Sequence, residues 1–273
     1  SFPNAVQTML DPADCGPACI SLCQDIQGQT FEYPEEFFKE RIHSIRRPRP
    51  DDFQIKEAAE KIKKSKNPII ISGGGVFYSN AMEELSNFAT KHNIPVTQTV
   101  MGYSTMKRDH SHYAGQIGGL GGKNTNDLAK ETDLAIAVGT KLADFTTGSW
   151  ANFENEKFKL VSINVSRFDA NKHLAQAIVG DAKVSLIELS KALGDWKVGD
   201  EWNEKSQREL KIWNEHIDKE SAPTNQEVPS YVQVIGAIYR NSEPTDIAVT
   251  AAGGLVGEVV QVWRPKELNT HES

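Results

Sequence analysis

The sequence predicts an α/β fold with a doubly wound parallel sheet at its centre. Short apolar runs such as residues 69–71 and 134–138 are typical of strands buried on both faces, and segments with helical apolar spacing lie between such runs. The 273 residues are 38% hydrophobic and 25% charged, which excludes a disordered or low-complexity chain. We therefore expect a Rossmann-like central domain, with ligands beyond the carboxyl ends of its strands.

Two proline-containing segments suggest where domains meet. Residues 46–50, RRPRP, favour neither a helix nor a central strand, and Pro223 and Pro229 bracket a second linker. The expected parts are the end of a first domain (1–45), the central domain (51–194), a helical connector (195–228) and the beginning of another α/β domain (229–273).

The first part contains one apolar run, Ala18–Cys23, which predicts a buried strand. Three cysteines lie in or beside this run: Cys15, Cys19 and Cys23. An odd number of cysteines in one short stretch fits a reducing compartment better than a disulfide framework. We interpret them as buried structural thiols, with a metal site as the alternative.

Membrane and nucleic-acid binding are not expected. The chain has no run of about 18 uncharged apolar residues, and its first ten residues lack the basic start and apolar centre of a signal peptide. The 30 Lys and Arg residues are outnumbered by 37 Asp and Glu, giving a net charge of −7. That balance argues against a broad nucleic-acid surface, so we expect a cytoplasmic protein.

A helix begins the central part. Asp51 or Asp52 can cap it, and Asn67-Pro68 ends it. Its apolar positions recur at helical spacing: Ile55, Ala58, Ala59 and Ile62. The apolar run 69–71 then predicts the first strand, which leads into the glycine turn Gly73–Gly75.

The remaining central elements follow in order. Asn80 and Glu83 resemble a capping box for a second helix, whose apolar positions are Ala81, Leu85, Phe88 and Ala89. Asp181 can cap a last helix with apolar Val184, Ile187 and Leu193. Further strands are expected at 96–100, 134–138 and 160–165, with a glycine-rich loop and a short polar helix near 126–131 between the first two of these.

Residues 196–220 are rich in charge and predict a helical connector. Trp202, Leu210 and Trp213 are spaced along it, so we expect it to bury its tryptophans on a neighbouring surface. A new unit then opens with a helix at 231–239, a strand at 247–250 and the turn Ala251-Ala252-Gly253-Gly254.

Two glycine-rich segments could suggest a nucleotide site. Gly73–Gly75 lies between a strand and a helix, but a dinucleotide fingerprint would need glycine where Tyr78 stands. A tight turn is favoured, and a phosphate-binding turn stays open as the alternative. The loop Gly118–Gly122 is not a nucleotide-phosphate loop, because Ile117 and Asn124 occupy positions that require glycine and Ser or Thr.

No catalytic or metal-binding residue is predicted. The segment Asp109–His112 offers two histidines without a supporting Cys or Glu cluster, so we interpret it as solvated surface. His92, His173 and His216 have charged neighbours and receive the same interpretation. The G-x-S-x-G motif of serine hydrolases does not occur.

The order of the parts, together with several phrases, resembles the thiamine-diphosphate enzymes of the acetohydroxyacid synthase and pyruvate decarboxylase superfamily. Gly16-Pro17-Ala18 is similar to the close of their first domain. The central domain is represented by NPIIISGGGVFYSNAMEEL (67–85), HSHYAGQIGGLGG (110–122) and DLAIAVGTKLADFTTG (133–148). TDIAVTAAGG (245–254) is similar to the first strand and turn of their third domain.

Two departures indicate one branch of that superfamily. Ser162–Val165 replaces an acidic strand, and TAAGGLVGEVVQVWRP follows the last expected strand. Both resemble the branch that hydrolyses a ring carbon–carbon bond of a cyclic 1,2-diketone in myo-inositol degradation, giving 5-deoxyglucuronate. An acetolactate-synthase-like enzyme and a stand-alone nucleotide-binding module are the alternatives.

The resemblance implies thiamine diphosphate and Mg²⁺ as cofactors. Gly253, Gly254 and Leu255 match the family turn where the backbone approaches the diphosphate, although an ordinary turn between strand and helix would look the same. The family's catalytic glutamate and magnesium motif do not occur within residues 1–273, so the resemblance implies a piece that is inactive alone. It also implies a homodimer or homotetramer acting on a small cyclic diketone.

Some members of the superfamily bind FAD or ADP on the central domain. The contact points would be Gly73–Gly75 and Gly118–Gly122, and neither segment carries a complete motif. We therefore expect no FAD.

Overall fold

The computed structural model describes residues 2–224, 226–251, 253–265, 267–268 and 271–272. The chain divides into two compact units, residues 1–48 and 49–273, which are described separately. Within the described residues, no helix has both the length and the apolar character needed to cross a bilayer.

The first unit contains three short helices: α1 (Phe2–Leu10), α2 (Gln24–Gln27) and the 3₁₀ helix η1 (Glu35–Phe38). The prediction of a buried strand at Ala18–Cys23 is wrong, because none of these residues lies in a helix or strand and most are exposed. Cys15, Cys19 and Cys23 are all exposed, so the prediction of buried thiols is also wrong. The reason is that none of the described residues of this unit is buried, and an apolar run cannot form a core strand without a core.

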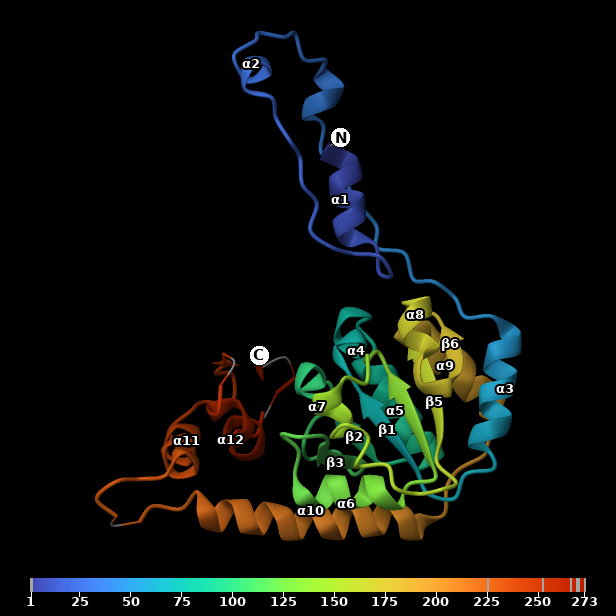
Figure 1. The fold of residues 1–273 in the computed structure, drawn as a ribbon, viewed down its shortest axis with the longest axis vertical. Coiled ribbons are helices and arrows are strands. Elements are labelled where there is room, and N and C mark those ends of the chain that lie inside the picture. The colour runs from blue at the N-terminus through green and yellow to red at the C-terminus, as the bar shows by residue number, and fades with distance from the viewer. Residues whose placement is uncertain (1, 225, 252, 266, 269–270, 273) are drawn as a thin grey trace. The chain divides into compact units, whose positions relative to one another are not determined.

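The second unit contains the predicted parallel sheet (Figure 1). Its six strands are all parallel in the order β3-β2-β1-β4-β5-β6. They are β1 (Pro68–Ser72), β2 (Val96–Gln98), β3 (Tyr113–Gln116), β4 (Leu134–Val138), β5 (Lys159–Asn164) and β6 (Gln176–Val179). Strands β1, β2, β4 and β5 confirm predictions, whereas β3 and β6 were not predicted.

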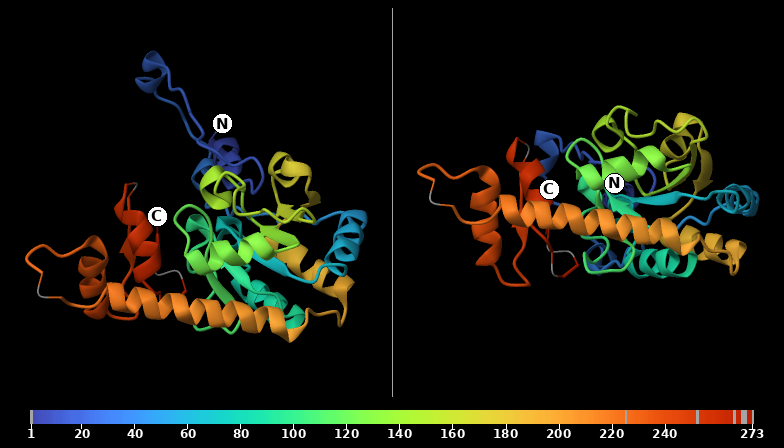
Figure 2. Two further views of the ribbon diagram at one scale, coloured as in Figure 1. Left: turned by 60° about the horizontal axis from the view of Figure 1, so that its bottom comes forward. Right: turned by 90° about the horizontal axis from the view of Figure 1, so that it is seen from below.

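Helices flank this sheet (Figures 1 and 2). One layer contains helices that contact one another: α3 (Asp52–Ile62), α4 (Gly74–Tyr78), α5 (Met82–His92) and α9 (Ala182–Leu193). Another layer is formed by α6 (Lys123–Glu131) and the long helix α10 (Asp200–Glu220), which both contact β3. Short helices follow several strands: η2 (Val100–Gly102), α7 (Asp144–Thr147), α8 (Arg167–Ala170) and η3 (Lys172–Leu174).

Helix capping agrees with two of the three predictions. Asp51 accepts a hydrogen bond from the amide of Phe53, and Asp181 accepts one from the amide of Val184. The capping box at Asn80 and Glu83 is wrong: Asn80 has a φ of 51°, and Ala81, which precedes α5, makes no side-chain cap. The short helix α4 ends just before Asn80, which therefore forms the turn between two helices.

The apolar positions of the helices are mostly those expected. All four apolar positions predicted for α3 are buried, and Leu193 of α9 is buried as well. Ile187, however, is exposed, because α9 packs through Leu186 and Leu189.

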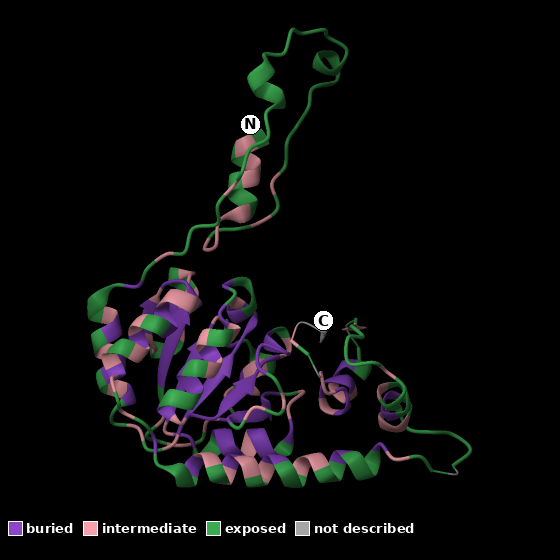
Figure 3. Cartoon of the chain, turned by 180° about the vertical axis from the view of Figure 1, so that it is seen from behind, coloured by how far each residue is buried: buried purple, intermediate pink, exposed green. Residues whose placement is uncertain are grey.

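The strands of the sheet form the centre of the main core (Figure 3). Trp202 and Leu210 of α10 are buried in this core, and the indole nitrogen of Trp202 donates to the carbonyl oxygen of Pro68 at 2.8 Å. Trp213 is half-buried against a second cluster that includes Ile217 and Val259. The expectation that α10 buries its tryptophans is therefore confirmed for Trp202, whereas Trp213 is only half-buried.

The C-terminal segment contains α11 (Tyr231–Arg240), β7 (Ala248–Val249), α12 (Leu255–Val262) and β8 (His271–Glu272), and β7 pairs with β8 in parallel. Helix α11 and strand β7 confirm the predicted helix at 231–239 and strand at 247–250 in outline. Ala252 of the predicted turn lies outside the described residues.

Candidate functional site

The order of the strands reverses between β1 and β4, which is where ligands bind in many α/β sheets. The turn after β1 is Gly73–Gly75, and Gly139 follows β4. The amide of Gly75 donates to the carbonyl oxygen of Gly139 at 2.9 Å, and a Cβ atom on Gly73 would lie 2.4 Å from that oxygen. The glycines therefore allow two backbone segments to meet, which supports a tight turn rather than a phosphate site.

The loop Gly118–Gly122 is also occupied by the protein's own chain. Gly118 has a φ of 102°, and a Cβ atom there would lie 2.1 Å from the carbonyl oxygen of Phe145. The side chain of Asn126 accepts from the amide of Gly118 and donates to its carbonyl oxygen, both at 2.9 Å. The loop is thus fixed by internal hydrogen bonds, in agreement with rejection of the nucleotide-phosphate motif.

The turn before α12 is different, because it is open. Gly253 has a φ of 145°, a conformation that favours glycine, and no described heavy atom lies within 4 Å of a Cβ placed on Gly253 or Gly254. Leu255 begins α12 and is 47% exposed. The first amides of a helix have no acceptors inside it, so this turn offers free donors beside open space. An open turn of this kind has room for an anionic group such as a diphosphate.

The packing of α12 sets the place of this turn. Val256 and Val260 form a cluster with Tyr103, against which Leu120 packs. Val259 and Val262 pack with residues of α10 and α11. Tyr103 and the neighbouring Arg108 were not singled out from the sequence, since nothing local indicates that they contact residues 155 to 160 positions further along the chain.

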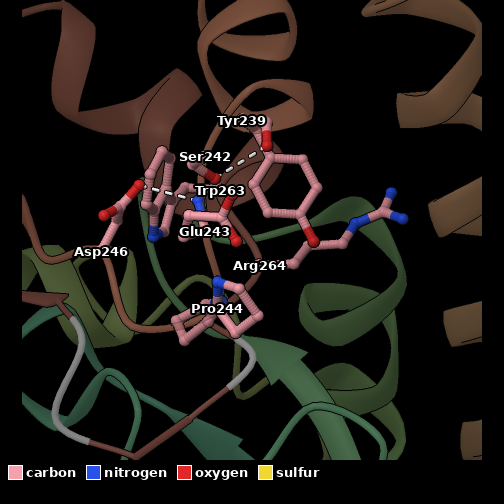
Figure 4. Close-up of a pocket in the computed structure, with 8 residues that line it drawn as sticks. Tyr239, Ser242, Glu243, Pro244, Asp246, Trp263 and Arg264 are labelled. Carbon is pink, nitrogen blue, oxygen red and sulfur yellow. Dashed lines mark hydrogen bonds between the residues drawn. The ribbon is translucent and has the colours of Figure 1, made fainter.

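A small pocket lies between the end of α11 and the residues that follow α12 (Figure 4). Tyr239, Trp263 and Arg264 line it together with the turn 242–246. The hydroxyl of Ser242 donates to the carbonyl oxygen of Tyr239, and the amide of Glu243 donates to Asp246, each at 2.8 Å. Because these polar groups are paired within the turn, we assign no ligand to this pocket.

The histidines differ from expectation in two cases. His92 is fully buried: its Nδ1 lies 2.6 Å from the carbonyl oxygen of Trp196, and its Nε2 lies 3.0 Å from the hydroxyl of Ser190. Burial lowers the pKa of His92 below its usual value. The spacing of His92 four residues after Phe88, on the apolar face of α5, is the signal that could have predicted this burial.

His112 is also buried, so its interpretation as solvated surface is wrong. Its Nε2 lies 2.9 Å from the side-chain oxygen of Asn93, and burial lowers its pKa. His173 and His216 are exposed, as predicted. Within the described ranges, no group of three or more His, Cys, Asp or Glu side chains could hold a metal ion.

Comparison of the sequence with known proteins identifies its family. Residues 55–189 match the family described as "Thiamine pyrophosphate enzyme, central domain". The chain is 37% identical over 293 aligned residues to the 3D-(3,5/4)-trihydroxycyclohexane-1,2-dione hydrolase of Clostridium botulinum (strain Alaska E43 / Type E3), covering 98% of this chain and 45% of the relative. It is 35% identical to the protein of the same name from Geobacillus thermodenitrificans (strain NG80-2), again covering 98% of this chain and 45% of the relative.

A third relative with that name, from Clostridium perfringens (strain 13 / Type A), is 35% identical and covers 95% of this chain and 44% of its own length. The chain thus spans a little less than half the length of the curated relatives it matches. The match with these relatives extends well beyond the central domain on both sides. The chain therefore belongs to the thiamine pyrophosphate enzyme family, with residues 55–189 as its central domain.

Proposed function

We propose that this chain is part of a thiamine-diphosphate-dependent hydrolase that cleaves a ring carbon–carbon bond of a cyclic 1,2-diketone in myo-inositol degradation. The observation that carries the proposal is the similarity, over 95% or more of this chain, to relatives named as trihydroxycyclohexane-1,2-dione hydrolases. The proposed division is a tail of a pyrimidine-binding domain (1–45), the central domain (51–194), a connector (195–228) and the start of a diphosphate-binding domain (229–273).

The open turn before α12 is the part of this chain that we assign to the cofactor. Gly253 and Gly254 leave room for the diphosphate beside the backbone, and the first amides of α12 would donate to its oxygens. The positive end of the helix dipole would add to the attraction. Thiamine diphosphate, when bound, supplies the nucleophilic carbon and the electron sink that carbon–carbon cleavage beside a carbonyl requires.

The proposal gives this chain no catalytic or metal-binding side chain. Mg²⁺ would balance the charge of the diphosphate, and the proposal places its ligands and the catalytic glutamate outside residues 1–273. The complete enzyme would be a cytoplasmic homodimer or homotetramer. Its central domain would carry no FAD, a proposal supported by the backbone contact between Gly75 and Gly139.

Turnover assays on two polypeptides test this function. One is the 273-residue chain, and the other is the uninterrupted reading frame that contains it, each supplied with thiamine diphosphate, Mg²⁺ and trihydroxycyclohexane-1,2-dione. We expect the longer polypeptide to form 5-deoxyglucuronate and the 273-residue chain to form none. Turnover by the shorter chain would contradict its proposed inactivity. Condensation of pyruvate by the longer polypeptide, without dione hydrolysis, would instead identify an acetolactate-synthase-like enzyme.

Substitution in the turn tests the cofactor assignment. Gly253→Val places a branched side chain at a φ of 145°, in the space assigned to the diphosphate. We expect the affinity of the longer polypeptide for thiamine diphosphate to fall at least tenfold. Gly199→Ala is the matched control, because Gly199 also precedes a helix and has no atom near its Cβ position, but φ is −60°.

A further inference from the structure

The last turn of α12 is capped by two side chains that lie beyond β2 in the sequence. The hydroxyl of Tyr103 donates to the carbonyl oxygen of Trp263, and it lies 3.4 Å from that of Val260. Nη1 of Arg108 donates to the same oxygen of Trp263 at 3.0 Å. Carbonyl groups in the last turn of a helix have no donors inside the helix, so Tyr103 and Arg108 supply the donors that α12 lacks.

The charge of Arg108 and the burial of Tyr103 both favour their hydrogen bonds to the end of α12. Arg108 forms no ion pair with a carboxylate in the part of the chain that the structure describes, and its guanidinium carbon lies 5.6 Å from the centre of the Tyr113 ring. Its positive charge instead faces the negative end of the α12 dipole. Tyr103 is only 6% exposed, and burial raises the pKa of its hydroxyl, which therefore keeps the proton it donates.

Further contacts hold the C-terminal half of α12 against the same region. The side-chain amide of Gln261 donates to the carbonyl oxygen of Leu120 at 2.6 Å, and its oxygen accepts from the indole nitrogen of Trp213 at 2.9 Å. Val260 is fully buried in the cluster that contains Tyr103. The hydrogen bonds of the side chains are thus concentrated on the C-terminal half of the helix.

At the N-terminal end of α12, Val256 packs against Tyr103, but no side-chain hydrogen bond is described for residues 253–258, and Gly253 and Gly254 are open to solvent. A helix of eight residues is about 12 Å long, so a tilt of about 10° at its anchored end would move the turn by about 2 Å. A displacement of that size exceeds the tolerance of a hydrogen bond to an oxyanion.

We propose that Tyr103 and Arg108 are positioning residues for the cofactor turn: by capping the C-terminal end of α12, they set where Gly253, Gly254 and the first amides of the helix lie. Tyr103 and Arg108 belong to the proposed central domain, and we call the pair the clamp. Through the clamp, the central domain fixes the position of the turn that would bind the diphosphate. This inference rests on the proposed function only where it names the diphosphate as the group bound at the turn.

Hydrogen–deuterium exchange on the 273-residue chain tests the clamp itself. We expect Arg108→Met and Tyr103→Phe each to speed exchange of the α12 amides about threefold, and the double variant about tenfold. Exchange in α9 is expected to stay unchanged, which shows that the sheet is intact. Arg108→Lys keeps a cation at the helix end and is expected to restore most of the protection.

The matched control is Arg167→Met, because Arg167 is exposed and its side chain makes no described hydrogen bond or ion pair. It removes the same charge without touching α12. Unchanged α12 exchange in the double variant, with α9 protection retained, would overturn the clamp. If Arg108→Met fails to fold, exchange of the α12 amides is compared between Tyr103→Phe and Arg108→Lys instead. Equal α12 exchange in these two variants and in the unaltered chain would then overturn the clamp.

Cofactor binding by the uninterrupted polypeptide separates this inference from the proposed function. We expect Arg108→Met to raise the Kd of thiamine diphosphate about tenfold and to leave kcat at saturating cofactor within about twofold, as a positioning role requires. If Gly253→Val weakens binding and Arg108→Met does not, the positioning role is wrong and the cofactor turn stands. If neither variant weakens binding, the cofactor assignment of the turn is wrong, whatever the exchange result.

Discussion

The amide of Gly75 donates to the carbonyl oxygen of Gly139 at 2.9 Å, joining the turns that follow β1 and β4. A Cβ atom on Gly75 would lie 2.5 Å from the Cα of Gly139. These turns flank the point where the strand order reverses, so the usual ligand crevice of an α/β sheet is occupied here by backbone. Gly75 and Gly139 therefore let the two turns pack directly against each other.

Gly75→Ala is therefore expected to destabilise the second unit by about 2 kcal/mol or more, because two backbone segments would have to separate. Urea unfolding of the 273-residue chain measures the change. Gly119→Ala is the control, since the nearest atoms to a Cβ there lie at 3.7 Å, and its effect is expected to stay within about 0.5 kcal/mol. Equal unfolding midpoints for the two variants would contradict the packing role of Gly75.

His92 is expected to make the stability of the fold depend on pH. Burial lowers its pKa in the folded state below the usual 6.5, so at lower pH the unfolded chain binds a proton that the folded chain does not. Its stabilising effect is complete above about pH 6.5 and is lost as pH falls toward the lowered pKa. The free energy of unfolding is expected to decrease as the pH is lowered from about 7 to about 5.

His92→Gln is expected to remove one proton from this dependence, which flattens the slope by at most about 1.4 kcal/mol per pH unit. A shallower slope remains, because burial also lowers the pKa of His110 and His112. Ile212→Ala provides the control, because Ile212 is 60% exposed and does not titrate, and it should leave the slope unchanged. A slope in His92→Gln as steep as in the unaltered chain would show that this group does not titrate as described.

Trp202 is expected to hold α10 on the sheet. Trp202→Phe removes the hydrogen bond to the carbonyl oxygen of Pro68 at a cost of about 1–2 kcal/mol, and Trp202→Ala also empties a buried site at a cost of about 3–5 kcal/mol. Thermal unfolding checks both values. Ile212 on the same helix is 60% exposed, so Ile212→Ala is expected to change stability by less than about 0.5 kcal/mol. Similar losses for Trp202→Ala and Ile212→Ala would contradict the docking role.

The sequence predicted those helices and strands whose own residues show a clear pattern, such as a continuous apolar run or a capping residue. β1 and β4 are continuous apolar runs, and Asp51 and Asp181 are standard helix caps, so each could be recognised alone. β3 was missed because its sequence, YAGQ, includes a glycine and a polar residue and becomes a strand only by pairing with β2.

Errors arose where burial depends on distant segments. The apolar run Ala18–Cys23 resembles a core strand, but the first unit supplies no core for it among the described residues. His92 resembles a polar helix end, but α9 and the segment after it cover its ring. Neither outcome follows from the neighbouring residues in the sequence, because burial is set by what packs against a side chain.

The sequence by itself determined the family and the α/β class, since these depend on residue types in order along the chain. Only the tertiary structure decided that Gly73–Gly75 is closed by Gly139, that the turn before α12 is open, and that Tyr103 and Arg108 cap α12. Those features are contacts between segments far apart in sequence, and folding alone brings their atoms within reach of one another.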